Sequence, residues 1–381
     1  MTGYPSEPRI YFDHNASAPL RDEAREAMIA ALEAGANPSS VHAEGRAGRR
    51  LIEDAREEVA ALVGATPAEV VFTSGASEAN NWVMAAGWQR IHVYGFEHES
   101  VLAPIRASGA EIEELPVERD GTADLGEFAR RVLSAETLPP RTLLTLQMAN
   151  SETGVVQDVA AASAFAREQG IAVHTDAVQA AGRLAVDFHD LNVDCLTISS
   201  HKLGGPMGVG ALVIRDGLMV PSLIKGGGQE RRRRAGTENV AAIAGFGAAA
   251  RVARGEVADM TGLGQLRDWL AAGIADILPD AVVIAGQSER LANTLSVALP
   301  GELAETSVIK LDLAGVAVSA GSACSSGKVG ASHVLAAMGV DERLARSTIR
   351  LSLGWSTTAD DVEAFLERLA RLRAKGSRRV A

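Results

Sequence analysis

The alternation of two kinds of periodicity between residues 69 and 215 constrains the fold more than any other feature of this sequence. Short runs of β-branched and other apolar residues alternate there with stretches of helical spacing, which is typical of a mostly parallel sheet covered by helices. We expect strands at residues 70–72, 91–94, 143–147, 171–174, 195–199 and 209–214. We expect helices at residues 76–88, 98–108 and 159–169. The central part of the chain therefore predicts an α/β fold.

The 381 residues of the chain exceed the usual size of one compact core. Helical spacing predicts two more long helices, at residues 43–63 and 237–254, which flank the central alternation. A second alternation of helix and strand then runs to the C-terminus. We therefore expect a large domain at residues 15–258 and a small α/β domain formed by residues 1–14 together with residues 259–381.

Charge and hydropathy argue against two classes of partner. The formal net charge of −11 gives no extended basic face for nucleic acid, and the four arginines at 231–234 form an isolated run, of the kind that is usually a solvated surface. No apolar run is long enough to cross a bilayer, and the first nine residues do not resemble a signal peptide. We expect a cytoplasmic protein that binds neither nucleic acid nor a membrane.

Lys202 is the first of several residues with the chemistry that a pyridoxal phosphate (PLP) enzyme requires. Such an enzyme needs a lysine, an acid at the pyridine nitrogen, an anion site for the phosphate and a group over the ring. Lys202 lies between an apolar strand and a glycine-rich turn, where a desolvated amine is more easily neutral and nucleophilic. An ordinary charge on a loop is the alternative.

Asp176 and Gln179 follow the expected strand at 171–174. A carboxylate at a buried strand end can hold the proton of the pyridine nitrogen, and a glutamine one turn later can reach the phenolic oxygen of the ring. A helix cap and an exposed helical glutamine are the alternatives.

Residues 73–78, Thr-Ser-Gly-Ala-Ser-Glu, join a strand end to a helix start. Free N–H groups and the helix dipole favour a phosphate there, with Ser77 as a hydroxyl donor, although ordinary N-capping explains the segment equally well. The nucleotide-binding pattern G-x-x-x-x-G-K-[ST] does not occur in the sequence. His98 follows the next strand, where an imidazole can stack on the ring or simply cap a helix.

These residues together resemble the cysteine desulfurases of the NifS/IscS type, within the class V aminotransferase family of fold type I PLP enzymes. The resemblance runs from residue 11 to residue 357. Its most specific pieces are F-T-S-G-A-S-E at 72–78, S-H-K at 200–202 with G-P at 205–206, R-A-G-T at 234–237, and S-A-G-S-A-C-S at 319–325. It implies a large domain with a mostly parallel seven-stranded sheet between helices, and a smaller C-terminal α/β domain that carries the catalytic cysteine loop.

The resemblance also implies how the cofactor is bound. Lys202 would bind it covalently, Asp176 would hold the pyridine nitrogen, and His98 would stack on the ring. The residues that would bind the phosphate are Ala76, Ser77, Ser199 and His201. The threonine at position 237 would reach the phosphate held by the partner subunit, which implies a homodimer with shared active sites.

Three further positions bear on substrate and cofactor contacts. By resemblance, Arg350 would bind the substrate carboxylate, as a planar guanidinium does through two N–H groups, and Asn37 would assist. A strand-edge salt bridge is the alternative for Arg350. Ser151 stands where the family usually has an asparagine that contacts the phenolic oxygen of the cofactor, and we treat it as a cofactor contact beside its neighbour Asn150.

The two cysteines have different surroundings. Cys195 lies in an apolar strand and predicts a buried structural residue, whereas Cys324 lies among glycines and serines and is a candidate nucleophile. The resemblance implies that L-cysteine becomes L-alanine, that the sulfur passes to Cys324 as a persulfide, and that His98 carries the thiol proton. The sulfur would go to an iron–sulfur scaffold or another acceptor protein. A selenocysteine lyase, another class V aminotransferase and a non-catalytic partner-binding homologue are the alternatives.

Overall fold

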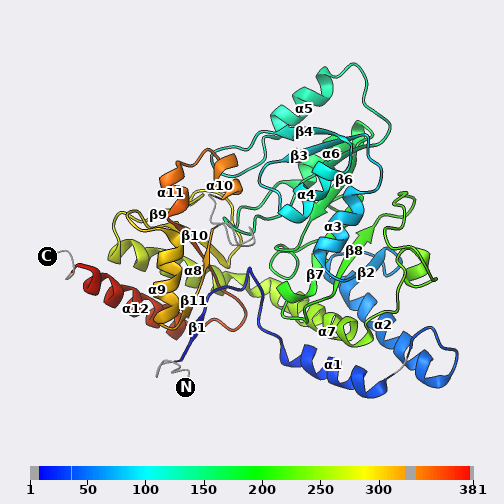
Figure 1. Cartoon of the computed structure of the whole chain (residues 1–381), viewed down its shortest axis with the longest axis horizontal. Coiled ribbons are helices and arrows are strands. Elements are labelled where there is room, and N and C mark those ends of the chain that lie inside the picture. Colours follow the sequence, from blue (N-terminus) through cyan, green and yellow to red (C-terminus); the bar gives the residue numbers. More distant parts are fainter. Residues whose placement is uncertain (1–7, 36, 322–331, 378–381) are drawn as a thin grey trace.

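The structure, a computed structural model, describes residues 8–35, 37–321 and 332–377. Within these residues the strands form one seven-stranded, one four-stranded and one two-stranded sheet. Figure 1 shows the seven-stranded sheet with its helices in one part of the molecule and the two smaller sheets in the other, close to both ends of the chain.

The large sheet has the strand order β2-β8-β7-β6-β5-β3-β4. β8 is antiparallel to both of its neighbours, and the other neighbouring strands are parallel. The predicted mostly parallel seven-stranded sheet is thus confirmed. Its strands are β2 (Val70–Thr73), β3 (Arg90–Tyr94), β4 (Glu111–Leu115), β5 (Thr142–Thr145), β6 (Ala172–Asp176), β7 (Cys195–Ser199) and β8 (Gly210–Ile214).

The strand that sequence patterning missed is β4, at the edge of this sheet. Its sequence, Glu-Ile-Glu-Glu-Leu, contains no apolar run, and most of its residues are exposed. Charged residues suit an edge strand because they discourage pairing with another chain. Arg90 and His92 of β3 lie 3.0 Å and 3.2 Å from the carboxylates of Glu111 and Glu113. Tertiary pairing with β3, rather than local sequence, therefore makes this segment a strand.

Helices cover both faces of the large sheet. One core joins α2, α5, α6 and α7 to residues such as Phe72 and Leu196, and a second joins α3 and α4 to Val71 and Cys195 on the opposite face. Neighbouring residues of one strand enter different cores because strand side chains alternate between faces. The helices are α1 (Asp22–Ala34), α2 (Ala43–Leu62), α3 (Ala76–Met84), α4 (Glu99–Ala107), α5 (Leu125–Ser134), α6 (Val159–Glu168) and α7 (Val240–Glu256).

The start of α7 differs from its predicted position. The helix begins at Val240 rather than at residue 237, because Asn239 caps it by accepting a hydrogen bond from the Ala242 N–H at 3.1 Å. Thr237 therefore precedes the helix. No helix in the described ranges is long and apolar enough to cross a membrane.

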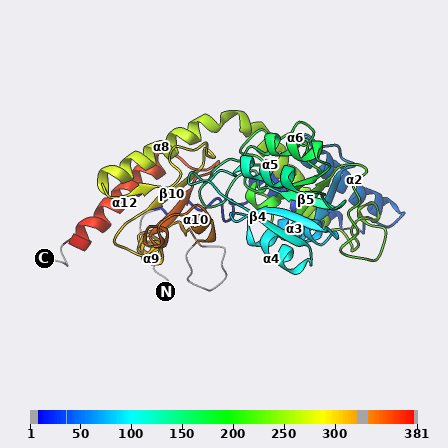
Figure 2. The same cartoon turned by 90° about the horizontal axis from the view of Figure 1, so that it is seen from above.

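The smaller part of the molecule has its own core, which includes Phe12, Leu270, Leu351 and Phe365. Its four-stranded sheet is antiparallel in the order β12-β13-β10-β9, and β1 pairs with β11 in parallel. Figure 2 shows α8 and α12 side by side along this part. The elements are β1 (Ile10–Tyr11), α8 (Met260–Ile277), β9 (Val282–Val283), β10 (Thr294–Ala298), α9 (Ala304–Leu313), β11 (Val316–Ala317), β12 (Ser319–Ala320), α10 (His333–Ala337), α11 (Glu342–Arg346), β13 (Thr348–Ser352) and α12 (Ala359–Ser377).

The pairing of β1 with β11 places the N-terminal segment beside the C-terminal part of the chain. Both strands contribute to the smaller core. The domain boundaries expected after residues 14 and 258 stay a prediction.

Candidate active site

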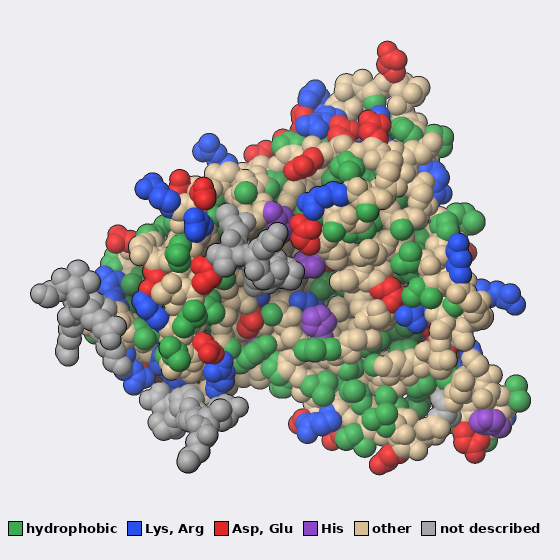
Figure 3. Space-filling model, in the orientation of Figure 1, with side chains coloured by type: hydrophobic (Ala, Val, Ile, Leu, Met, Phe, Trp, Pro, Cys, Tyr) green, Lys and Arg blue, Asp and Glu red, His purple; other side chains and the backbone are tan. Residues whose placement is uncertain are grey.

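A cavity of about 570 Å³ lies where the strands β2, β6 and β7 end. Open α/β sheets place their ligands at this edge, outside the carboxyl ends of the strands. In Figure 3, histidine side chains gather near the middle of the face, between the two parts of the molecule. The predicted site residues that line the cavity are Ala76, Ser77, His98, Ser151, Asp176, Gln179, Ser199, His201, Lys202 and Arg350.

Lys202 lies in the turn that follows β7. Its Nζ donates hydrogen bonds to the backbone oxygens of Asn15 and Ala16, the latter at 2.9 Å. Residues 15–17 form one wall of the cavity. The Lys202 side chain therefore extends from the turn after β7 to the N-terminal segment.

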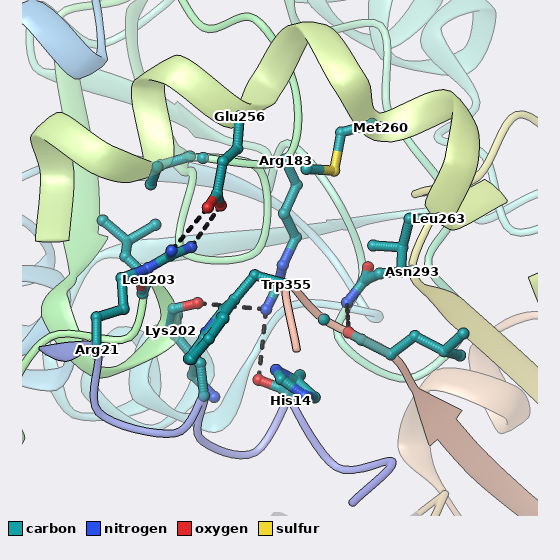
Figure 4. A pocket seen from close by; sticks show the side chains of 16 residues that line it. His14, Arg21, Arg183, Lys202, Leu203, Glu256, Met260, Leu263, Asn293 and Trp355 are labelled. Carbon is teal, nitrogen blue, oxygen red and sulfur yellow. Dashed lines mark hydrogen bonds and ion pairs between the residues drawn. The ribbon is translucent and has the colours of Figure 1, made fainter. Parts of the chain in front are cut away.

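A second, small cavity is lined by Lys202 together with Arg21 and Arg183, as Figure 4 shows. The guanidinium of Arg21 pairs with both carboxylate oxygens of Glu256, at 2.8 Å and 2.5 Å, and lies over the ring of Trp355. Arg183 donates to the backbone oxygen of Lys202 at 3.5 Å. Because Nε of Arg21 also donates to the backbone oxygen of Leu203 at 2.8 Å, Arg21 connects the turn that carries Lys202 to α7 and to the C-terminal part of the chain.

Asp176, the last residue of β6, is held by two hydrogen-bond donors. Its Oδ1 accepts the backbone N–H of Val178 at 2.9 Å, and its Oδ2 accepts Nδ2 of Asn80 at 2.8 Å. The carboxylate therefore has one orientation, at the edge of the cavity where the strands end.

Gln179 is buried rather than exposed on a helix surface. Its Nε2 donates to the backbone oxygen of Asn15 at 3.1 Å, and Arg183 donates to its Oε1. The exposed alternative for Gln179 is therefore wrong, and the amide faces the same wall as Lys202.

The N-terminus of α3 has the features of an anion site. No side chain caps the helix, so the N–H groups of its first turn, at Ala76 and Ser77, remain available to a ligand. The nearby acid Glu78 is already occupied, because its carboxylate pairs with Arg234 at 2.9 Å and accepts the Ser74 N–H at 2.7 Å. The charge of Glu78 is thus compensated, and the helix N-terminus stays attractive to a phosphate.

His98 caps a helix and also faces the cavity. It is the N-cap of α4, because its Nδ1 accepts the Ser100 N–H at 3.1 Å, and its ring also lines the cavity. Burial lowers the pKa of His98. Burial therefore favours the neutral form of the ring.

The sequence analysis did not identify Glu97 as a buried acid. Its side chain is inaccessible to solvent, and its Oε1 accepts the Gln147 N–H at 2.5 Å. Burial, and then the charge of Asp176, raises the pKa of Glu97 to about 8. Glu97 therefore keeps its proton at neutral pH, beside an acid that the sequence assigns to the cofactor.

Other cavity residues that the sequence analysis missed are Asn15, Ser100 and Gln147. Asn80 lies behind them and is completely buried. A signal for Asn80 exists, since it follows Ala76 by four positions and so shares a helical face with the expected phosphate site.

Arg350 lies in β13, between β12 and β10, and only 2% of it is exposed. Its two terminal nitrogens donate to the Ser151 backbone oxygen at 3.0 Å and to Oδ1 of Asp13 at 2.8 Å. A salt bridge is therefore present, as in the alternative interpretation, but it lies on an inner strand and beside the cavity. The neighbouring Asn150 uses its Oδ1 to accept the Glu152 N–H at 2.8 Å, so it shapes the loop instead of lining the cavity.

Two predicted residues in the described part of the chain do not line this cavity. Thr237 and Asn37 are exposed and do not line it, and Asn37 accepts the Ser39 N–H at 2.9 Å within its own loop. Cys324 lies outside the described residues. Cys195 is buried, as predicted, and burial raises the pKa of its thiol.

Acid should destabilise the fold through His14, which is 2% exposed. Burial, and then the charges of Arg183 and Arg21, lowers the pKa of His14 to about 4. The unfolded chain binds this proton near pH 6.5, so the free energy of unfolding falls as the pH drops through this window. The free energy of unfolding of the wild type should fall between pH 7 and pH 5. We expect His14→Gln to reduce this fall by about 2 kcal/mol.

Urea unfolding of the wild type and His14→Gln at both pH values measures this difference. His42→Gln replaces an exposed histidine in the same way, and it should reduce the loss of unfolding free energy by less than His14→Gln does. A loss in His14→Gln equal to that of the wild type would contradict the assignment.

Comparison with known proteins agrees with this geometry over nearly the whole chain. The Aminotransferase class-V family matches residues 10–365. The chain is 40% identical over 375 residues to the cysteine desulfurase IscS of Dictyoglomus turgidum, covering 95% of this chain and 94% of that protein. It is also 40% identical over 371 residues to a cysteine desulfurase of Cereibacter sphaeroides, covering 94% of each.

Solved structures show the same relationship. A NifS-like protein from Rickettsia africae superposes with a TM-score of 0.89 at 33% identity, over 96% of this chain and 99% of that one. A structure described as SspA in complex with cysteine superposes with a TM-score of 0.77 at 31% identity, over 90% and 98% of the two chains. The chain therefore belongs to the class V aminotransferase family, among the cysteine desulfurases of the NifS/IscS type.

Proposed function

We propose that this protein is a PLP-dependent cysteine desulfurase that converts L-cysteine to L-alanine and passes the sulfur to Cys324. The observation that carries the proposal is that one cavity brings together Lys202, Asp176, His98 and Arg350. A lysine, an acid, an imidazole and a carboxylate-binding arginine in one cavity match the needs of PLP chemistry on an amino acid.

The residues around the cavity fit the cofactor. The uncapped N-terminus of α3 offers N–H groups and the Ser77 hydroxyl to the phosphate, and the oriented carboxylate of Asp176 suits a protonated pyridine nitrogen. We assign Ser199 and His201 to the phosphate, and Gln179 and Ser151 to the phenolic oxygen. When bound, the cofactor ring withdraws electrons from the Cα of an attached amino acid and so weakens the bonds there.

The protein side of the reaction begins with orientation of the substrate. Arg350 would bind the carboxylate of cysteine, because its guanidinium is already held at the cavity by Asp13 and the Ser151 backbone. Fixing the carboxylate fixes the direction of the Cα–H bond. The Nζ of Lys202 would then take the Cα proton, as a positioned base within the cavity.

The sulfur step is assigned to Cys324. Its Sγ would form a bond to the substrate sulfur while the Cβ–S bond breaks, and Cβ would gain a proton to become the methyl group of alanine. The sulfur is oxidised as the carbon is reduced, so no external oxidant is required. The persulfide that results on Cys324 can be passed to a thiol of an acceptor.

Arg350→Lys should weaken substrate binding more than it affects cofactor binding. A lysine keeps the charge but lacks the planar pair of donors that matches a carboxylate. We expect KM for cysteine to rise about 10- to 100-fold, which corresponds to about 1.4–2.8 kcal/mol. Steady-state kinetics and the visible absorption of the bound cofactor measure the two effects.

The control for this variant is Arg346→Lys, since Arg346 is exposed and its ion pair with Glu342 is long, at 3.9 Å. It should leave KM unchanged. An unchanged KM in Arg350→Lys would show that Arg350 does not bind the substrate carboxylate.

Incubation of the purified protein with L-cysteine tests the proposed activity as a whole. With a thiol reductant present we expect equal amounts of alanine and sulfide, and without it a persulfide mass on the peptide that contains Cys324. Faster turnover of selenocysteine would favour a selenocysteine lyase, and amino transfer to a keto acid would favour an aminotransferase. Absence of bound cofactor in the purified protein would favour a non-catalytic homologue.

We also propose a cytoplasmic homodimer that delivers sulfur to an iron–sulfur scaffold or another acceptor protein. Support for the dimer comes from Thr237, which is exposed and outside the cavity of its own chain, as expected of a residue that reaches the partner's phosphate. Asn37 is likewise exposed, and we keep it as a candidate substrate contact.

A further inference from the structure

Asn80 connects two residues of the proposed active site that lie on different elements. It is completely buried in α3, and its Nδ2 donates to Oδ2 of Asp176 at 2.8 Å and to Oγ of Ser100 at 2.9 Å. An ionised carboxylate can only accept hydrogen bonds, so the amide nitrogen of Asn80, and not its oxygen, must face Asp176. Both N–H groups of the amide are then used.

Ser100 contacts both Asn80 and His98. Its Oγ already accepts a hydrogen bond from Asn80, and it lies 2.8 Å from Nδ1 of His98. Because Nδ1 accepts the backbone N–H of Ser100, the hydrogen between Nδ1 and Oγ is the hydroxyl proton of Ser100. The backbone N–H of Ser100 also points to Nδ1, at 3.1 Å. Nδ1 thus faces two donors and cannot carry a hydrogen of its own.

The charged groups around His98 agree with a neutral ring. Burial lowers its pKa most. Of the charged neighbours, Asp176 and Glu99 favour a charged ring, whereas Lys202 and His333 disfavour it. The net effect is a pKa below the ordinary value for histidine.

We propose that Asn80 and Ser100 are positioning residues that hold His98 as the neutral tautomer with its single hydrogen on Nε2. This inference rests on the proposed function, in which His98 faces the cofactor and substrate. His98 then presents a hydrogen-bond donor to the cavity. The proton-carrier role that the resemblance implies for His98 stays a prediction.

Nitrogen NMR of the holoenzyme with ¹⁵N-labelled histidine tests the tautomer directly. The signals of His98, among the eight histidines of the chain, are identified by their loss in His98→Gln. We expect the wild type to show a neutral ring with the hydrogen on Nε2. A hydrogen on Nδ1, or a charged ring at neutral pH, would overturn the proposal.

Ser100→Ala tests the connection through the hydroxyl. Removing one donor to Nδ1 makes protonation of that nitrogen easier, so the titration of His98 should shift to higher pH. Ser100→Thr restores a hydroxyl and should return the titration toward that of the wild type. Ser108→Ala, a serine-to-alanine change at the end of the same helix, should cause no shift.

Asn80→Ala should shift the titration in the same direction as Ser100→Ala, because the Ser100 hydroxyl loses the donor that holds its oxygen in place. No shift in Ser100→Ala would overturn the proposal even if Asn80→Ala fails to fold. The NMR result is independent of turnover, so a failure of the proposed desulfurase activity is seen separately, in the alanine and sulfide assay.

Discussion

Lys202→Ala is expected to remove both the covalent attachment of the cofactor and the release of sulfide from cysteine. The Nζ of Lys202 is the amine that faces the cavity from the turn after β7, and it serves the reaction both as the attachment point and as the base. Loss of a positioned acid–base group costs about 10²- to 10⁴-fold in rate, and loss of the covalent attachment adds to this. We expect at least about a 10⁴-fold decrease in turnover.

The visible absorption of the lysine-bound cofactor and the rate of alanine formation measure these two effects. Lys310→Ala is the matched control, because Lys310 is exposed on α9 and pairs with Glu302. It should keep both the absorption and the rate. Normal absorption in Lys202→Ala would show that another lysine binds the cofactor.

Cys324→Ala should separate the two halves of the reaction. Cofactor binding and the spectral response to cysteine depend on the residues around the cavity, so both should persist. Sulfide release needs the thiol as acceptor of the substrate sulfur, and loss of a nucleophile commonly costs about 10³-fold or more. We expect a loss of this size in sulfide release with a normal cofactor spectrum.

Cys195→Ala is the control for this variant. Cys195 is 1% exposed and belongs to the core under α3 and α4, so the change should affect stability slightly and leave sulfide release unchanged. Sulfide release at the normal rate in Cys324→Ala would show that Cys324 is not the nucleophile.

Local sequence was sufficient for the buried strands of the large sheet. β5, β7 and β8 are buried along their whole length, and such strands appear as continuous apolar runs. The edge strand β4 has no such run, and only its pairing with β3 makes it a strand. A buried strand can therefore be predicted from its run of apolar residues, whereas the edge strand β4 cannot.

Residues of the cavity were predictable where they follow a strand end or lie in a motif of the family, as Asp176 and Lys202 do. The residues that orient them were not. Asn80 meets Asp176 across 96 positions of sequence, and Arg350 meets Asp13 across 337. Nothing local to either residue reveals such a partner.

By itself, the sequence determined the class of fold and the chemical groups available for PLP chemistry, because periodicity and residue type are local properties. Only the tertiary structure decided which donor meets which acceptor. It paired Asn80 with both Asp176 and Ser100, and it placed the hydroxyl and the backbone N–H of Ser100 beside Nδ1 of His98. Hydrogen-bond partners are determined by distance and direction in space, and these exist only after strands and helices that are distant in sequence have packed together.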